Sequence, residues 1–141
     1  MHPALNKFIE LYRRDLAGVD MSIIDEIYSS DVEFIDPAHN IHGIAALIDY
    51  FNGMMCNLTY CHFDIREVHE LEGSATLCWT MTIAHPKLKG GKKIAVDGMT
   101  LLRFDQKVNF HRDYFDLGAM LYEHIPLLGG AIKFLKRGLA H

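Results

Sequence analysis

The sequence predicts a single α+β domain, spanning residues 1–141, in which helices cover one face of a curved, mostly antiparallel sheet. Two observations lead to this fold class. Apolar residues recur at helical spacing through much of residues 3–55, and four runs of strand-like alternation follow, separated by turn residues. Helices followed by consecutive strands are typical of domains whose helices are segregated to one side of a sheet. The chain is also long enough to bury a core of its own.

Three helices are expected before the strands. The first covers about Pro3–Leu16, where apolar residues return every three or four positions. Asp20 can cap a second helix, whose apolar residues extend to Tyr28. Gly43 precedes a third helix, which runs to Met55. These helices would supply the layer that packs inside the sheet.

The strands begin with a short alternating segment that contains Val32 and Phe34 and ends in the turn at Asp36-Pro37. Four longer strands follow the third helix, at residues 62–71, 75–85, 94–104 and 108–115. A sheet of this kind, curled around the helices, leaves a conical pocket between the two layers. Alternate strand residues and the inner helix faces would then line that pocket.

A last apolar helix is expected over residues 118–139, interrupted by Pro126 and Gly129-Gly130. Its broad apolar stripe leaves three uses open. It could cover the mouth of the pocket, form a dimer interface, or lie on a membrane surface.

Composition excludes several classes of function. The formal net charge is −4 and most basic residues are scattered, which argues against a nucleic-acid surface. No apolar run reaches the roughly 20 residues that cross a bilayer, and the first residues lack the pattern of a signal peptide. The three cysteines form no Cys-x-x-Cys pair, so reduced thiols in a cytoplasmic protein are expected. No dinucleotide or phosphate-loop motif is present, and no cofactor is expected.

The strand at residues 108–115 carries the strongest chemical signal. Side chains alternate along a strand, so His111, Asp113 and Phe115 share one face. A charged residue at an inward position needs a partner, and His111 or Tyr12 could supply one for Asp113. His111 could be a proton shuttle, the orienter of Asp113, or a hydrogen-bonded core histidine. An imidazole and a carboxylate on a pocket wall would support acid–base chemistry.

Asp36 has two interpretations. An aspartate before a proline can simply cap a turn. In a pocket lined by aromatic residues it would instead be desolvated and become a functional acid or base. The aromatic residues expected in that lining are Phe8, Phe34, Trp79 and Phe115. His39 and His42 follow Asp36, but metal sites need three or four converging ligands, so no metal is expected.

Two stretches of the sequence resemble the nuclear-transport-factor-2-like superfamily, and within it SnoaL-like proteins, ketosteroid isomerases and limonene-epoxide hydrolases. Asp31–Pro37, with the later Ile41-His42-Gly43, is similar to an isomerase segment that ends in Asp-Pro and later reads Ile-His-Gly. Arg112–Leu117 is similar to the last strand of the hydrolases. The resemblance implies one SnoaL-like domain with a conical fold, a small apolar ligand and a homodimer.

The resemblance also implies roles for single residues. Asp36 falls where the isomerases place the carboxylate that moves a proton beside a carbonyl. Tyr12 falls where they keep a tyrosine that donates to the developing oxyanion. Asp113 falls where the hydrolases keep the acid that protonates the epoxide.

Four positions depart from these families. Thr100 replaces the protonated oxyanion-binding aspartate of the isomerases, and it is a weaker donor that would still line the ligand site. Met81 and Ile83 replace the Arg-x-Asp pair of the hydrolases, and Phe34 replaces their pocket tyrosine. Neither named activity can therefore be transferred intact.

Two functions follow from these observations. In the first, the protein is an enzyme in which Asp36, Asp113, His111 and Tyr12 perform isomerase, cyclase or hydrolase chemistry on a small apolar carbonyl or epoxide compound. In the second, the same pocket holds a hydrophobic ligand without converting it, and the domain serves as a binding or scaffold module. The sequence does not identify the ligand.

Overall fold

The computed structural model describes residues 1–120 and 137–139, and it contains a single six-stranded sheet with the order β2-β1-β6-β5-β4-β3. The strands are β1 (Tyr28–Ile35), β2 (Asn40–His42), β3 (Tyr60–Leu71), β4 (Ser74–Ala84), β5 (Ile94–Phe104) and β6 (Val108–Phe115). The helices are α1 (Pro3–Tyr12), α2 (Ile44–Met55) and the short α3 (Leu117–Met120), with 3₁₀ turns η1 (Leu16–Gly18), η2 (Met21–Glu26) and η3 (Lys89–Gly91). This is the predicted α+β architecture.

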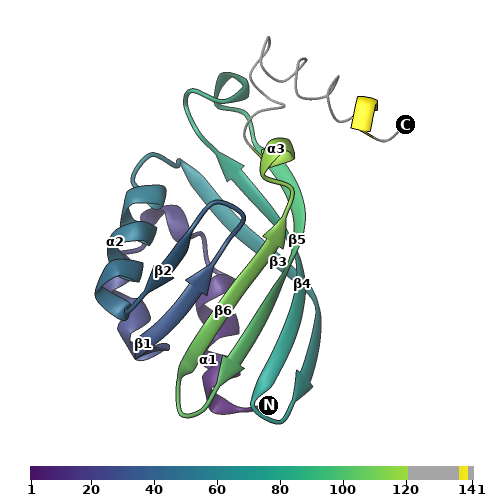
Figure 1. Cartoon of the computed structure of the whole chain (residues 1–141). Coiled ribbons are helices and arrows are strands. Elements are labelled where there is room, and N and C mark those ends of the chain that lie inside the picture. Colours follow the sequence, from purple (N-terminus) through teal and green to yellow (C-terminus); the bar gives the residue numbers. More distant parts are fainter. Residues whose placement is uncertain (121–136, 140–141) are drawn as a thin grey trace.

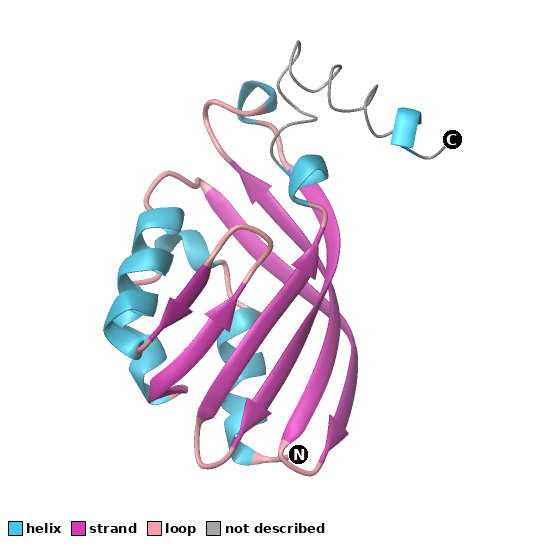
Figure 2. Ribbon diagram, in the orientation of Figure 1, coloured by secondary structure: helices cyan, strands magenta, loops and turns pink. Residues whose placement is uncertain are grey.

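The sheet curves strongly, and α1 and α2 lie on its inner side (Figure 1). All neighbouring strands are antiparallel except β1 and β6, which run parallel. β1 and the short β2 lie against α2, while β3, β4 and β5 are the longest strands of the sheet (Figure 2). The result is an open, conical half-barrel with helices in its concave side.

The predicted first helix is too long, because α1 ends at Tyr12. His2 caps its start by accepting a hydrogen bond from the backbone N–H of Ala4, and a proline follows at the first helical position. Asp15 then accepts from the N–H of Ala17 and caps the separate turn η1. A residue that caps a new turn cannot continue the previous helix, so the chain changes direction here.

The predicted second helix is partly wrong. Asp20 does cap an element, since its side chain accepts from the N–H of Ser22. That element is the 3₁₀ turn η2, and Tyr28, expected at the helix end, is the first residue of β1. Tyr28 pairs with Val108 on β6, and this sheet pairing overrides the local helical spacing. The three-residue strand β2 is not predicted by the sequence at all.

The second half of the chain agrees closely with the sequence. β5 and β6 have the predicted bounds, and α2, β3 and β4 differ from prediction by at most two residues. Along β4, Leu77, Trp79 and Met81 are buried while the residues between them are partly exposed. This alternation directs one side of the sheet into the core. The core includes Leu5, Phe8 and Tyr12 from α1.

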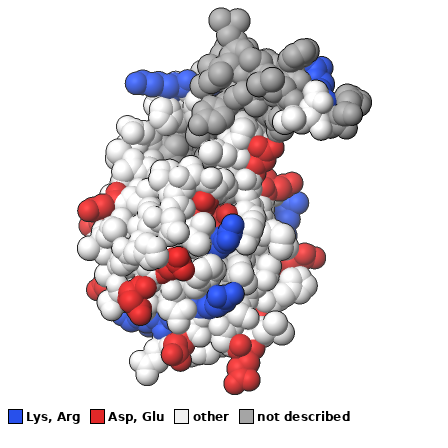
Figure 3. Space-filling view, viewed as in Figure 1, with Lys and Arg blue, Asp and Glu red and all other residues white. Residues whose placement is uncertain are grey.

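The predicted last helix, residues 118–139, falls mainly outside the described residues, and so do Pro126 and Gly129-Gly130. None of the helices in the described part of the chain is long and apolar enough to cross a membrane. On the face shown in Figure 3, basic and acidic side chains are interspersed rather than gathered into a patch of one sign.

Candidate functional site

A cavity of about 620 Å³ lies between the sheet and the helices. Most of its lining is apolar or aromatic, and its inner wall is made by residues from the predicted inward faces of the strands. These include Phe34 of β1, Phe63 of β3, Trp79, Met81 and Ile83 of β4, and Phe115 of β6. A largely apolar cavity with a few polar groups is the usual form of a small-molecule site.

Asp113 projects from β6 into this cavity, and its side chain is 14% exposed. One carboxylate oxygen, Oδ1, accepts two hydrogen bonds. The Thr100 hydroxyl donates at 2.6 Å from the paired position on β5, and Nε2 of His111 donates at 2.7 Å from the same strand. The second oxygen, Oδ2, accepts no hydrogen bond from any described residue. Asp113 therefore presents one free carboxylate oxygen at the cavity wall.

His111 lies behind Asp113 and is 1% exposed. Its Nδ1 is 2.7 Å from the Tyr28 hydroxyl, which in turn is 2.8 Å from the Tyr12 hydroxyl. A carboxylate can only accept, so Nε2 of His111 carries a hydrogen. Nδ1 of His111 is hydrogen-bonded to the Tyr28 hydroxyl, and that hydroxyl to Tyr12, so the four residues form one continuous hydrogen-bonded chain that ends at Asp113.

The two phenols stay protonated over the physiological range. Burial is the main cause, and it raises the pKa of Tyr28 and of Tyr12 far above the usual value of 10.0. For Tyr12 the hydrogen bond with Tyr28 partly offsets this rise. Both residues therefore remain hydrogen-bond donors at any pH at which the protein would work.

A second branch reaches Asp113 through Thr100. Nε1 of Trp79 donates to the Thr100 hydroxyl at 2.8 Å, so Thr100 in turn donates to Asp113. The indole lies against Gly98, the residue paired with Trp79 on β5; a Cβ at position 98 would come within 2.3 Å of the ring. The indole can therefore reach the Thr100 hydroxyl only because position 98 has no side chain.

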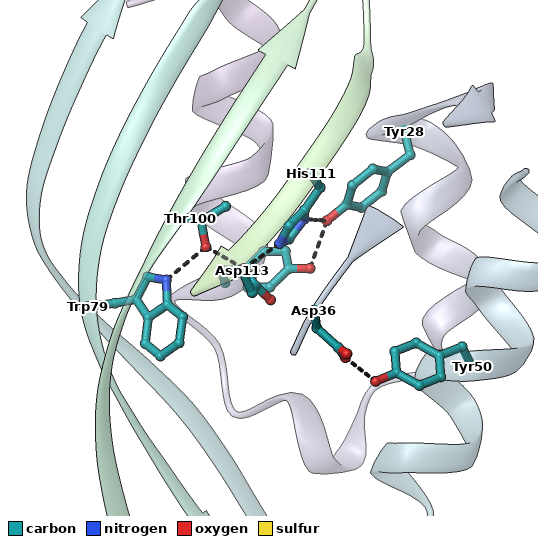
Figure 4. Close-up of polar contacts among 8 residues, drawn as sticks. Tyr28, Asp36, Tyr50, Trp79, Thr100, His111 and Asp113 are labelled. Atoms are coloured by element: carbon teal, nitrogen blue, oxygen red, sulfur yellow. Dashed lines mark hydrogen bonds and ion pairs between the residues drawn. The ribbon is translucent and has the colours of Figure 1, made fainter. Parts of the chain in front are cut away.

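We call the six residues Tyr12, Tyr28, Trp79, Thr100, His111 and Asp113 the Asp113 network (Figure 4). They come from α1 and from four strands, β1, β4, β5 and β6. Both branches end on the same oxygen of the same carboxylate. Such convergence fixes the orientation of the carboxylate, because each donor holds the same oxygen in place.

Asp36 lies across the cavity from Asp113 and is bound differently (Figure 4). Its Oδ1 accepts from the backbone N–H groups of Ala38 and His39, which makes the predicted turn. Its Oδ2 accepts a hydrogen bond from Tyr50 of α2, and Nδ1 of His39 lies 3.1 Å from Oδ1. We call Asp36, His39 and Tyr50 the Asp36 cluster. Asp36 therefore forms the turn and also lines the cavity, and a functional role for its carboxylate stays a prediction.

Tyr50 is also held in its protonated form. Burial raises the pKa of its phenol, and the carboxylate of Asp36 raises it further. The Tyr50 proton is therefore committed to Asp36. The hydrolases keep a pocket tyrosine at the position of Phe34. Here Tyr50 of α2 supplies a phenol to the cavity wall instead.

The structure separates the predicted site residues into two groups. Six line the cavity: Tyr12, Phe34, Asp36, Trp79, Asp113 and Phe115. Phe8, Thr100 and His111 do not, since each is at most 2% exposed and lies behind that wall. Phe8 and Thr100 line a small second pocket together with Tyr12 and Trp79, and their contact with a ligand stays a prediction. Phe8 stacks on Tyr12 at 4.1 Å between ring centroids.

Three features of the site were not predicted from the sequence: Tyr28, Tyr50 and the part that His39 plays at Asp36. Tyr28 and Tyr50 both occur within helix-like apolar spacing, where a tyrosine is indistinguishable from a core residue. The one available signal was the missing phenol at position 34, which leaves room for a donor from another element. His42 lies 3.8 Å from Glu33 and away from Asp36, and the described residues contain no group of three potential metal ligands.

The comparisons with known proteins agree with this geometry. A family model described as a SnoaL-like domain matches residues 8–108, which is more than half of the chain. No curated protein matches the sequence.

Solved structures with the same fold include a hypothetical protein from Catenulispora acidiphila, described as having a ketosteroid isomerase-like fold and bound to trimethylamine. It is 15% identical, with a TM-score of 0.72 over 84% of this chain and 89% of its own. A protein from Shewanella putrefaciens, provisionally named a SnoaL-like polyketide cyclase, is 19% identical, with a TM-score of 0.69 over 85% and 95%. TerC, co-crystallised with polyporic acid, is 18% identical, with a TM-score of 0.66 over 84% and 95%. The matched residues and the shared fold show that this chain belongs to the SnoaL-like domain family.

Proposed function

We propose that this protein is a cofactor-independent acid–base catalyst that moves a proton on a small, largely apolar compound. One observation carries the proposal: two hydrogen-bonded branches converge on Oδ1 of Asp113 and leave Oδ2 free at the wall of an apolar cavity. A carboxylate that is fixed in orientation and keeps one oxygen free at an apolar cavity is suited to act as a general base.

In the proposed reaction, Oδ2 of Asp113 removes a proton from a carbon of the ligand. The C–H bond breaks, an O–H bond forms on Asp113, and the electron pair stays on the ligand. Asp113 then returns the proton at another position, as in an isomerase- or cyclase-type reaction. His111 and Thr100 act as positioning residues, since they hold Oδ1 and do not touch the ligand.

The Asp36 cluster has a supporting part in this proposal. Both oxygens of Asp36 already accept hydrogen bonds, so it is less available as a base than Asp113. We assign it to fixing Tyr50 and the loop at the mouth of the cavity. This reverses the weight that the family resemblance places on Asp36 and Asp113. We assign Tyr12 to the Asp113 network, because its hydroxyl is hydrogen-bonded to Tyr28.

Deuterium exchange tests the proposal even while the ligand is unidentified. The protein is incubated in D₂O with an extract of small apolar metabolites, and mass spectrometry follows compounds that gain deuterium, disappear, or stay bound to the protein. We expect at least one compound to exchange or react with the wild type and not with Asp113→Asn. Asp97→Asn is the matched control, because Asp97 is exposed on the outer sheet face and accepts from Thr80 at 2.6 Å, as Asp113 accepts from Thr100.

A second candidate is passive binding of a hydrophobic ligand. It is favoured by Met81 and Ile83, two apolar residues that line the cavity where the epoxide hydrolases keep a charged pair. Two neighbours of the same fold were crystallised with small organic molecules, which supports a ligand site under either candidate. Compounds retained equally by the wild type and Asp113→Asn, with none exchanged or consumed, would favour this candidate over catalysis.

We further propose that the protein forms a homodimer through the outer face of the sheet and works in the cytoplasm. Met99 and Tyr114 are neighbours on β5 and β6 and are 44% and 49% exposed on that face. Light scattering of the wild type and Met99→Glu tests the dimer, which the variant should weaken. The cytoplasmic location is supported by Cys56, Cys61 and Cys78, all of which are free thiols.

A further inference from the structure

The charged side chains that line the cavity include aspartates and, among the described residues, no lysine or arginine. Asp36, Asp49 and Asp113 contribute the carboxylates. The two histidines of the lining, His39 and His85, are exposed or half-exposed. An anionic ligand would thus meet negative charge without a fixed cation to pair with.

The donors of the cavity wall are already used. The Tyr12 hydroxyl is hydrogen-bonded to that of Tyr28, the Tyr50 hydroxyl donates to Asp36, and the Trp79 indole donates to Thr100. The other side-chain donors in the described lining are Asn57, the two histidines and the weakly donating Cys61 thiol. A ligand oxygen would therefore find few donors in the inner part of the cavity. A ligand N–H group would find the free Oδ2 of Asp113.

Aromatic rings surround the same carboxylate. Trp79 and Phe115 both line the cavity, with ring centroids 6.2 Å apart, and Phe63 packs edge-on against Trp79 at 4.9 Å. Aromatic faces attract cations through the ring quadrupole, most strongly for tryptophan. A carboxylate beside such rings is a suitable environment for an ammonium or iminium group on an otherwise apolar molecule.

We propose that the cavity is selective for small, largely apolar amines, whose cationic nitrogen lies beside Oδ2 of Asp113 and against the rings of Trp79 and Phe115. This inference rests on the proposed function, since both place the ligand at Asp113. It adds the chemical class of that ligand. A cationic nitrogen would also acidify neighbouring C–H bonds, which are the bonds that a general base breaks.

Three probes of similar size and different charge test the proposal: benzylamine, benzyl alcohol and benzoate. Their affinities for the full chain are measured by titration calorimetry at neutral pH. Trp79 is the only tryptophan, so its fluorescence shows whether each probe enters this cavity. We expect benzylamine to bind about tenfold or more tightly than benzyl alcohol, and benzoate to bind most weakly.

Asp113→Asn should remove the advantage of benzylamine and leave the affinity for benzyl alcohol unchanged, which also shows that the cavity is intact. Asp97→Asn changes the charge equally outside the cavity and should keep the full preference. Tighter binding of benzoate or benzyl alcohol, no binding of benzylamine, or a preference that survives Asp113→Asn would overturn the inference.

Deuterium exchange separates this inference from the proposed function. A preference for benzylamine without Asp113-dependent exchange on any compound would support the ligand class and contradict catalysis. Exchange on neutral compounds, with no preference among the three probes, would support catalysis and contradict the ligand class.

Discussion

Asp36 and Asp113 face the same cavity from opposite sides, but they are held by different kinds of contact. Asp36 takes most of its hydrogen bonds from the loop that it belongs to, at Ala38 and His39, with one addition from Tyr50. Asp113 depends on residues from α1 and from three other strands, connected through His111 and Thr100. The local arrangement saturates both oxygens of Asp36, whereas the long-range network leaves one oxygen of Asp113 free. Availability for chemistry thus follows from how each carboxylate is held.

The largest expected difference is in activity. On any compound found to exchange with the wild type, Asp113→Asn should lower the rate by about a thousandfold, because it removes the general base. Asp36→Asn should lower it by less than about tenfold, because Asp36 acts only on position. Initial rates of deuterium incorporation measure both. A larger loss for Asp36→Asn would reverse the assignment of the base.

The second largest difference is expected in stability, between variants of the Asp113 network and variants of the Asp36 cluster. His111→Phe removes two buried hydrogen bonds, to the Tyr28 hydroxyl and to Oδ1 of Asp113, and should lower the free energy of unfolding by about 3 kcal/mol. Tyr50→Phe removes a half-exposed phenol and should cost about 1 kcal/mol. Urea unfolding followed by circular dichroism gives both values. Equal losses would mean that the Asp113 network is no more cooperative than the Asp36 cluster.

Two glycines offer a matched test of packing. Gly98→Ala would place a methyl group 2.3 Å from the indole of Trp79, so we expect a loss of about 2 kcal/mol and a changed tryptophan emission spectrum. Gly53 lies in α2 on the Asp36 side, with open space around it, so Gly53→Ala should gain up to about 1 kcal/mol from helix propensity. Thermal unfolding with fluorescence detection compares them. A stable Gly98→Ala protein with unchanged emission would show that the indole position is not constrained by β5.

Alkaline pH should lower the free energy of unfolding through the two tyrosines of the Asp113 network. Below pH 10 the phenols of Tyr12 and Tyr28 are protonated in both the folded and the unfolded chain. Above pH 10 the unfolded chain loses these protons and the folded protein keeps them, because burial raises both pKa values. The free energy of unfolding should then fall by about 1.4 kcal/mol per pH unit for each phenol. Burial, with the charge of Asp15 adding to it, raises the pKa of Cys61 to about 12, so this thiol adds a slope of the same sign above pH 9.0.

The Tyr28→Phe variant checks that slope. It should flatten the decline of stability above pH 10 by about 1.4 kcal/mol per pH unit, as measured by urea unfolding at several pH values. An unchanged slope would show that the Tyr28 phenol ionises as readily in the folded protein as in the unfolded chain.

The difference between local contacts and contacts of distant segments also explains which features could be predicted from the sequence. Asp113, His111 and Phe115 share a face because they alternate along one strand, and no register shift occurs between Phe110 and Phe115. The turn at Asp36 is local and was also predictable. β5 and β6 were predicted within their bounds because alternation and turn residues agree there.

The remaining parts depend on contacts between distant segments. Tyr28 follows an apolar run with helical spacing, and only its pairing with β6 makes it a strand residue. Tyr50 shares the helical spacing of the core residues in α2. Its role depends on the hydrogen bond to Asp36, which the sequence does not show. The sequence also could not show that Tyr12 faces Tyr28 rather than a ligand, since that depends on how α1 crosses the sheet.

The parallel pairing of β1 with β6 has a consequence for the order of folding. β6 is the last strand among the described residues, yet it lies between β1 and β5 in the sheet. β1 cannot join the main part of the sheet until β6 has formed, and closing so long a loop is slow. On the ribosome, the N-terminal segments therefore wait until β6, which ends at Phe115, has emerged. The hydrogen bond between Tyr28 and His111 connects β1 with β6. The Asp113 network can therefore be complete only after these two strands have paired.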